Sequence, residues 1–174
     1  MTEKKPQNLE IDNLDKEILS ILMADATIPY TEIAKRLIIS GGTVHVRMKK
    51  MQDMGIIEGS QLNVNAQKIG YDICAFLGIF LQKGSKYNEA VERLKEVKEI
   101  VELHYCTGAY SMFAKIVCKD TNHLRRVLND DIQAAPGIQR TETFISLEES
   151  IKRQIQIAYK QVSPDNYRGL LAIG

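Results

Sequence analysis

One stretch of the sequence, Ile73 to Leu81, limits the possible folds more than any other. Its residues carry no polar side chain, and the stretch is too short for a helix that crosses a bilayer but suits a β-strand. Read as a strand, it has one face made of Ile73, Ala75, Leu77, Ile79 and Leu81, and another made of Cys74, Phe76, Gly78 and Phe80. Because both faces are apolar, we expect both to be buried.

The segments around this strand predict a ferredoxin-like domain. In chain order we expect a strand over Tyr71–Gln82, a helix over Tyr87–Glu96, strands over Ile100–Thr107 and Ser111–Lys119, a helix over Thr121–Ile132 and a strand over Ile138–Leu147. In this βαββαβ order the helices cover one face of the sheet. A second copy of the sheet is the simplest cover for the other face, so we expect a homodimer. The C-terminal segment and the N-terminal half are the alternative covers.

The first part of the chain has the spacing of helices instead. The apolar positions of three short helices are Leu14, Ile18, Ile21 and Leu22, then Ile33, Ala34 and Leu37, then Val44, Met48 and Met51. Thr31 is the expected cap of the second helix. The tight connection between the second and third helices is typical of a helix-turn-helix, and Ile57–Val64 alternates as a wing strand would. The predicted class is therefore α+β, with a winged helix-turn-helix domain before the ferredoxin-like domain.

These patterns divide the chain into five parts. We expect a flexible N-terminus over 1–10, the helix-turn-helix domain over 11–64, a linker over 65–70, the ferredoxin-like domain over 71–150 and a C-terminal helix and tail over 151–174. The spacing of Ile151, Ile155 and Tyr159 predicts the helix in the last part.

The charges are unevenly distributed, although the net charge is only +1. Residues 1–32 contain three lysines and seven acids, whereas residues 33–52 contain five basic residues and no acid. Such a local basic patch lets a nearly neutral protein bind phosphate. The candidate DNA contacts are Thr31, Lys35, Arg36, Ser40, Gly41, Gly42, Thr43, His45, Val46, Arg47, Lys49 and Lys50.

The third expected helix has the features of a DNA-reading helix. Ser40 and the two glycines that follow it let the start of the helix approach a phosphate closely. Thr43 and His45 can hydrogen-bond with base edges, and Val46 can contact a thymine methyl group. The long cations suit the DNA backbone: Lys35, Arg36, Lys49 and Lys50. The alternative is a basic helix face that contacts only solvent.

The sequence indicates little other chemistry. Three cysteines without CxxC spacing predict neither a disulfide framework nor a zinc ribbon. His104 and His123 lie in different expected elements, so we expect no metal site. No Ser/His/Asp grouping or glycine-rich phosphate loop suggests an enzyme or a cofactor. The N-terminus has no apolar run after its lysines, so we expect a cytoplasmic protein without a membrane partner.

The loop Tyr105–Ser111, between two expected strands, is rich in hydroxyl groups and contains Gly108. A glycine permits a left-handed backbone and can expose amides to a small ligand. An ordinary hairpin turn is the alternative, and the residues alone favour it.

Five motifs are similar to those of a known family. They are Ile11–Leu19, Gly41–Met51, Gly55–Gly59, Gly70–Asp72 and Thr107–Ser111. Together they resemble the Lrp/AsnC (feast/famine) family of bacterial transcription regulators, over a range from Ile11 to about Leu147. Through Thr43–Arg47 and Gln139–Leu147 the chain is most similar to the asparagine-responsive branch of that family.

The resemblance implies an N-terminal DNA reader and a C-terminal domain for amino-acid sensing and oligomerisation. Members form dimers through their sheets and often octamers of four dimers, and effector amino acids bind in clefts between dimers. The corresponding residues here are Tyr105, Thr107, Gly108, Ala109, Tyr110, Ser111 and Gln133. Asparagine is the expected effector, although Ala109 replaces the polar residue of that branch.

We therefore expect a regulator that binds double-stranded DNA sequence-specifically, and whose assembly or DNA affinity responds to a small amino acid. The alternative is a ferredoxin-like small-molecule-binding module or enzyme whose helical domain mediates protein contacts. The basic segment 33–52 argues against that alternative.

Overall fold

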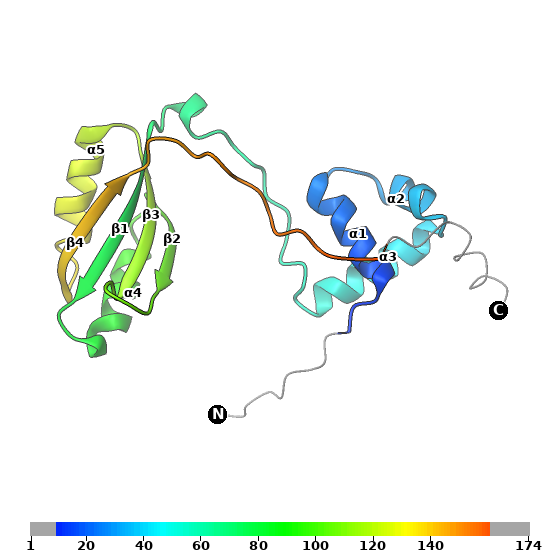
Figure 1. Ribbon diagram of the computed structural model, residues 1–174, viewed down its shortest axis with the longest axis horizontal. Helices are drawn as coiled ribbons and strands as arrows, with labels where there is room; N and C mark the ends of the chain where they lie inside the picture. Colours follow the sequence, from blue (N-terminus) through cyan, green and yellow to red (C-terminus); the bar gives the residue numbers. More distant parts are fainter. Residues whose placement is uncertain (1–9, 161–174) are drawn as a thin grey trace. The chain divides into compact units, whose positions relative to one another are not determined.

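The computed structural model describes residues 10–160 of the 174-residue chain. They form two compact units (Figure 1): residues 10–62 together with 153–160 make the first, and residues 63–152 make the second. Residues 153–160 therefore fold with the beginning of the chain rather than with the segment that precedes them. The parts expected over 1–9 and 161–174 lie outside the described residues.

The first unit is a bundle of α1 (Asn13–Ala24), α2 (Tyr30–Leu37) and α3 (Gly41–Asp53). The start of α1 is capped twice. Asp12 accepts a hydrogen bond from the Asp15 amide (2.9 Å), and the Asp15 carboxylate accepts one from the Asp12 amide (3.2 Å). The expected cap of α2 at Thr31 is wrong, because that helix already begins at Tyr30, after Pro29.

The connection from α2 to α3 is short because Ile38 adopts a left-handed backbone, with φ at 55°. This conformation is uncommon for a β-branched residue. It ends α2 abruptly, and Ser40 then caps α3 by accepting a hydrogen bond from the Thr43 amide (3.0 Å). The three helices bury one shared core, in which Ile18, Ile33, Val44 and Met51 are fully enclosed. The expected helix-turn-helix is confirmed.

The C-terminal segment completes this unit without forming a helix. Residues 151–160 have no regular secondary structure, so the helix predicted from Ile151, Ile155 and Tyr159 is wrong. Instead, the Asn13 side chain pairs with the backbone of Lys160, donating to its carbonyl (2.7 Å) and accepting from its amide (2.8 Å). Ile157 packs against the core of the bundle, whereas Ile155 is 80% exposed. Because the segment is held at these two points and Ile155 is exposed, its apolar residues do not form the single buried side that a helix would need.

The wing strand expected over Ile57–Val64 is also not formed. Ile56 and Ile57 pack against the core of the bundle, but Leu62 and Val64 are exposed. An extended segment becomes a strand only when another backbone exchanges hydrogen bonds with it. No described strand pairs with this segment.

The second unit is a four-stranded antiparallel sheet with helices. Its main elements are β1 (Ile73–Leu81), α4 (Tyr87–Leu94), β2 (Ile100–Tyr105), β3 (Met112–Cys118), α5 (Thr121–Arg126), the π-helical turn η3 (Val127–Ile132) and β4 (Ile138–Ile145). The short 3-10 turns η1 (Gln67–Ile69) and η2 (Gly84–Lys86) lie on either side of β1 in the chain. The strand order β2-β3-β1-β4 places β1 in the centre, which confirms the ferredoxin-like plan.

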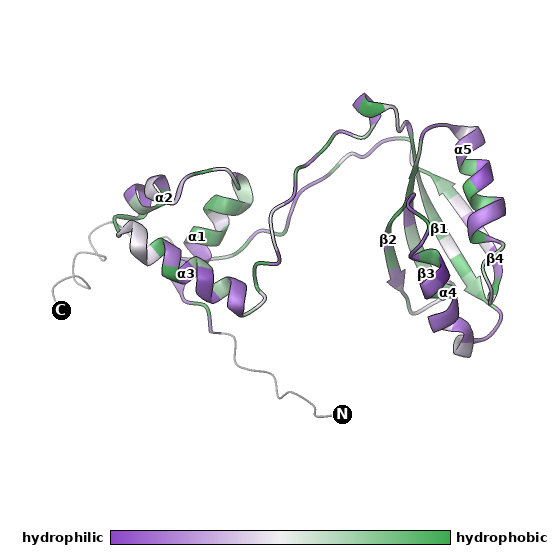
Figure 2. Ribbon diagram, turned by 180° about the vertical axis from the view of Figure 1, so that it is seen from behind, coloured by the Kyte–Doolittle hydropathy of each residue, from purple (hydrophilic) through white to green (hydrophobic). Residues whose placement is uncertain are grey.

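One face of this sheet is covered by its own helices. Ala75, Leu77 and Ile79 of β1 are fully buried against residues of α4, such as Leu94, and residues of α5 and η3, such as Val127. Figure 2 shows the matching pattern, with hydrophilic outer surfaces on α4 and α5 and apolar residues along the strands. The odd-numbered residues of β1 therefore form the inner face of the sheet.

The opposite face of the sheet carries a group of aromatic rings, which we call the aromatic face. Phe76 stacks with Phe113, with ring centroids 6.0 Å apart, and the Tyr110 ring lies 5.1 Å from that of Phe80. Phe144 of β4 approaches Tyr110 edge-on. Within the described chain no helix covers these rings. Both faces of β1 are therefore apolar, as the sequence predicts.

Candidate DNA-binding and effector sites

Helix α3 turns its apolar side inward and its polar side outward. Val44, Met48 and Met51 are buried, and the residues of α3 that are predicted to contact DNA all lie at exposed or half-buried positions. Val46 is 67% exposed, so its methyl groups are accessible to another molecule. The predicted cations of α2, Lys35 and Arg36, are exposed as well.

Two cations of α3 are held by acids from the start of α1. The Nη1 atom of Arg47 lies 2.6 Å from a carboxylate oxygen of Asp12 and 2.8 Å from one of Asp15, and Lys50 Nζ lies 3.1 Å from the other oxygen of Asp15. The sequence predicts Arg47 and Lys50 as DNA contacts and does not indicate the two acids as their partners. The pairing was missed because the partners lie more than 30 residues apart along the chain.

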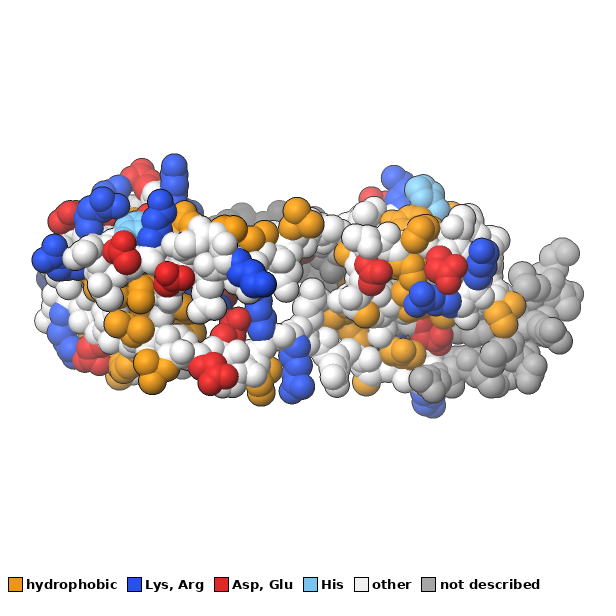
Figure 3. All heavy atoms as spheres, turned by 90° about the horizontal axis from the view of Figure 1, so that it is seen from above, with side chains coloured by type: hydrophobic (Ala, Val, Ile, Leu, Met, Phe, Trp, Pro, Cys, Tyr) orange, Lys and Arg blue, Asp and Glu red, His pale blue; other side chains and the backbone are white. Residues whose placement is uncertain are grey.

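These ion pairs shift the pKa values of Asp12 and Arg47. Burial works to raise the pKa of Asp12, but the Arg47 guanidinium and the Asp15 amide outweigh it, so the pKa lies below its usual value. Burial likewise works to lower the pKa of Arg47, and the two carboxylates raise it above its usual value. Figure 3 shows acidic and basic side chains interspersed over the first unit.

A hollow of about 480 Å³ lies between this charged group and the outward side of α3. Its lining residues are Asp12, Gly42, Thr43, Val46, Arg47 and Lys50. The Thr43 hydroxyl shares a hydrogen bond with the Ser40 hydroxyl (2.8 Å), which holds it at the start of the helix. Apart from its chain neighbours and the backbone of its own helix, nothing lies within 4 Å of the position that a Cβ would take at Gly41, so another molecule can approach the backbone there.

The predicted effector loop, Tyr105–Ser111, is fastened to the end of β1. The Cys106 amide donates to the Ser111 carbonyl (3.0 Å), and the Ser111 amide donates to the Ile79 carbonyl (2.9 Å). Gly108 has a φ of +113°, a conformation that favours glycine. Ser111 turns its hydroxyl toward β1, where it accepts a weak hydrogen bond from the Leu81 amide.

The segment that contains Gln133 reaches the same end of β1. The Gln82 amide donates to the Gly137 carbonyl (2.9 Å), and the Gln133 amide group donates to the Thr141 hydroxyl (3.3 Å). The structure therefore places both predicted parts of the effector site next to the last residues of β1. Tyr105 is 64% exposed, and its ring centroid lies 4.4 Å from that of Tyr87, a neighbour that the sequence did not indicate.

Tyr110 leaves this loop and lies on the aromatic face. Its hydroxyl donates to Glu142 (2.7 Å), and Arg140 contacts the same carboxylate while lying 3.5 Å above the Phe80 ring. The hydrogen bond to Glu142 raises the pKa of Tyr110, and the bond from Arg140 lowers the pKa of Glu142. The Tyr110 side chain thus belongs to the sheet surface rather than to the open part of the loop.

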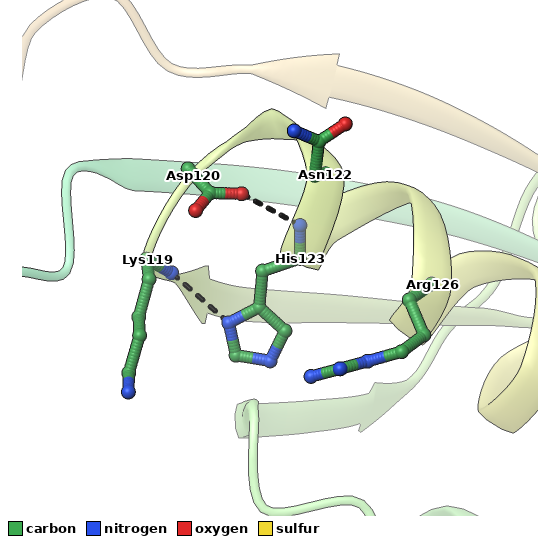
Figure 4. Close-up of a pocket in the computed structure, with 5 residues that line it drawn as sticks. All are labelled: Lys119, Asp120, Asn122, His123 and Arg126. Carbon is green, nitrogen blue, oxygen red and sulfur yellow. Dashed lines mark hydrogen bonds between the residues drawn. The ribbon is translucent and has the colours of Figure 1, made fainter.

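A second hollow, of about 270 Å³, lies at the beginning of α5 (Figure 4). The His123 ring there accepts a hydrogen bond from the Lys119 amide at Nδ1 (3.2 Å), and its Nε2 lies 3.0 Å from Glu99. This histidine therefore links two chain segments of the domain. Within residues 10–160 no three His, Cys, Asp or Glu side chains gather as metal ligands would. Nor is any helix in that range long and apolar enough to span a membrane.

Comparisons with known proteins match both units. Residues 11–58 match the winged helix-turn-helix DNA-binding family, and residues 74–156 match the Lrp/AsnC ligand binding domain. The regulatory protein AsnC of Haemophilus influenzae is 42% identical over 146 residues, which cover 84% of this chain and 97% of that protein.

Solved structures agree with this picture. The structure of AsnC from Escherichia coli is 41% identical, matches with a TM-score of 0.82, and covers 85% of this chain and 99% of that one. A transcriptional regulator from Neisseria meningitidis, solved in complex with L-methionine, has the same fold at 17% identity, with a TM-score of 0.79 over 86% of this chain and 97% of that one.

The fold and these matches define a class of protein, a transcription regulator that joins a helix-turn-helix to a ligand-binding domain. More narrowly, the chain belongs to the Lrp/AsnC family.

Proposed function

We propose that this regulator reads DNA with the outward side of α3, and that an amino acid, asparagine in the first place, controls its assembly or its DNA affinity. The observation that carries the proposal is the exposure of α3. Its buried side holds the helix in the bundle, and its other side presents Thr43, His45, Val46 and Lys49 to the surroundings. Helices presented in this way enter the major groove.

The contacts divide by chemistry. Thr43, His45 and Val46 would face base edges. The phosphate backbone would be held by Lys35, Arg36 and Lys49, by Thr31, and by the capped start of α3 at Ser40, Gly41 and Gly42. Two chains of a dimer would place two such helices in successive major grooves, so the preferred site should be roughly palindromic.

Selection from randomised duplex DNA tests this placement. Val46→Ala should relax the preference for one base pair, because it removes the methyl groups that contact thymine. Lys35→Ala should weaken binding to all sequences and flatten the dependence on salt by about 0.9 for each bound helix. If a folded Val46→Ala variant selects the same sequences as the wild type, α3 does not read bases through this side chain.

For the assembly, we propose a dimer that buries the aromatic face, and an octamer of dimers in the cytoplasm. The support is the group of rings that the helices of one chain leave uncovered. A second copy brings an identical apolar surface, as a two-fold interface requires. The C-terminal segment, the alternative cover, has its anchors on the first unit instead.

For the effector, we propose the end of β1, between the loop Tyr105–Ser111 and Gln133. Backbone amides beside Gly108 would bind the α-carboxylate of an amino acid, and Thr107 and Gln133 would pair with its polar groups. Ala109 and Tyr105 would line the site. A Gln133 amide that faced an apolar ligand would cost about 1–3 kcal/mol, which favours asparagine over leucine.

Calorimetric titration with asparagine, glutamine and leucine tests the effector. Gln133→Leu keeps the size of the side chain and removes its amide, so it should weaken asparagine binding more than leucine binding. If the wild type binds leucine more tightly than asparagine, the effector assignment is wrong while the DNA-binding assignment is unaffected.

A further inference from the structure

The start of α1 and the middle of α3 are joined by a compact group of four charged side chains, Asp12, Asp15, Arg47 and Lys50. Arg47 and Lys50 are three positions apart on α3, so they lie on the same side of that helix. Both reach Asp15, and Arg47 also reaches Asp12. We call this group the α1–α3 brace.

Burial makes the brace an obligatory contact rather than a surface ion pair. The Asp15 side chain is fully buried, and a buried carboxylate without cationic partners is strongly destabilising. Its two oxygens are both used, since Arg47 donates to one and Lys50 and the Asp12 amide donate to the other. Arg47 itself is only 25% exposed. The acids cannot release these cations at low cost.

We propose that Arg47 and Lys50 are positioning residues that fix α3 against α1, and that they do not bind DNA phosphate. This inference rests on the proposed DNA-reading side of α3. Among the cations of α3 it assigns the phosphate contact to Lys49, which has no ion pair or hydrogen bond within residues 10–160 and is exposed.

The electrostatics of the hollow beside α3 support a phosphate contact by Lys49 rather than by Arg47. A phosphate at Arg47 would also approach the Asp12 carboxylate, which is 55% exposed and lines the same hollow. Repulsion between the two anions opposes such a contact. Thr43 and Val46 line the same hollow, so the brace forms one wall of the surface that would receive the base edges. Its geometry therefore shapes the surface that α3 would present to the groove.

Two adjacent lysines of α3 allow a matched experiment. Lys49→Met and Lys50→Met make the same change at neighbouring positions, one outside the brace and one inside it. Each variant is titrated with a DNA duplex of random sequence over a series of NaCl concentrations. Lys49→Met should flatten the salt dependence by about 0.9 for each bound helix, and Lys50→Met should leave it unchanged.

Arg47→Met tests positioning directly. At a temperature where circular dichroism shows it folded, this variant should bind the preferred duplex roughly tenfold more weakly with the wild-type salt dependence, because the helix is misplaced rather than stripped of a phosphate contact. Arg47→Lys, which can still reach one carboxylate, should recover part of the affinity. Asp12→Asn should weaken DNA binding in the wild type and have little further effect in Arg47→Met.

The outcomes separate the possible roles. A salt dependence that falls in Lys50→Met or Arg47→Met as it does in Lys49→Met would show a phosphate contact and overturn the inference. So would a folded Arg47→Met that binds DNA as tightly as the wild type, since the brace would then be structural only. If Lys49→Met also leaves the salt dependence unchanged, the proposed DNA-binding side of α3 is wrong. The positioning role of Arg47 is then tested by the effect of Asp12→Asn in the wild type and in Arg47→Met.

Discussion

At the scale of single residues, Gly78 shows how closely the aromatic face is packed. A Cβ atom at this position would lie 2.4 Å from the Tyr110 ring, so only glycine leaves room for the ring beside β1, where its hydroxyl reaches Glu142. We predict that Gly78→Ala destabilises the protein by about 1–3 kcal/mol, because the ring must move. Thermal unfolding measures this, with Gly84→Ala as the control, since that position is open. Equal midpoints for the two variants would contradict the packing.

Acid should weaken the contact between Asp12 and Arg47. The pKa of Asp12 is lowered in the folded protein by Arg47 and the Asp15 amide, so its ionised form stabilises folding above the unfolded pKa. That contribution is lost as the pH falls through the lower, folded pKa. The protection of the α1 and α3 amides against hydrogen exchange, measured relative to the intrinsic exchange rate at each pH, should therefore fall as the pH is lowered below about 5. Asp12→Asn should lose less protection over the same range, and an identical pH dependence would count against the brace.

Individual residues also show which features of the DNA-binding site could be predicted from the sequence and which could not. The exposure of Val46 and Lys49 follows from helical spacing, because Val44, Met48 and Met51 define the buried side. The capture of Arg47 by Asp12 and Asp15 does not follow from spacing, since it depends on how two helices cross. Basic residues next to an acidic segment indicate a local patch, but only the fold decides which charges neutralise each other.

At the scale of elements, strong periodicity was a reliable guide to the sheet domain. The expected strand over Tyr71–Gln82 is formed over Ile73–Leu81, and all six expected elements of that domain are present. The two expected elements that are not formed, the wing strand over Ile57–Val64 and the C-terminal helix, share one cause. Both are short segments whose state depends on a distant partner rather than on their own pattern, as Asn13 shows for residues near Lys160.

The C-terminal segment makes a testable contribution to the first unit. Ile157 packs against the three-helix core, whereas Ile155, two residues away, is largely exposed. We predict that Ile157→Ala lowers the free energy of unfolding of this unit by about 1–2 kcal/mol, less than a fully buried isoleucine would. Urea unfolding followed by NMR signals of α1–α3 measures the effect, and Ile155→Ala is the matched control. An unchanged midpoint for Ile157→Ala would mean that the segment does not hold in solution.

At the scale of the whole molecule, the two units differ in the kind of surface that they leave uncovered. The helical unit buries its apolar residues in one core and exposes polar chemistry on α3, as a DNA reader requires. The sheet domain buries one side of β1 and leaves aromatic rings on the other. Tyr110 connects that open face with the predicted effector loop, because its backbone lies in the loop and its ring lies on the sheet.

We expect the aromatic face to be the interface between copies of this chain. If a second copy covers the rings, Phe76→Asp places a charge without a partner in an apolar interface, and the dimer should dissociate. Light scattering at micromolar concentration should show at least a dimer for the wild type and a smaller species for Phe76→Asp. Ile69→Asp is the control, because that side chain is exposed on η1, away from the sheet. Far-ultraviolet circular dichroism must show that Phe76→Asp remains folded, since Phe76 also stacks on Phe113 within one chain. A wild type that is monomeric in this measurement would show that the aromatic face is not an interface between copies.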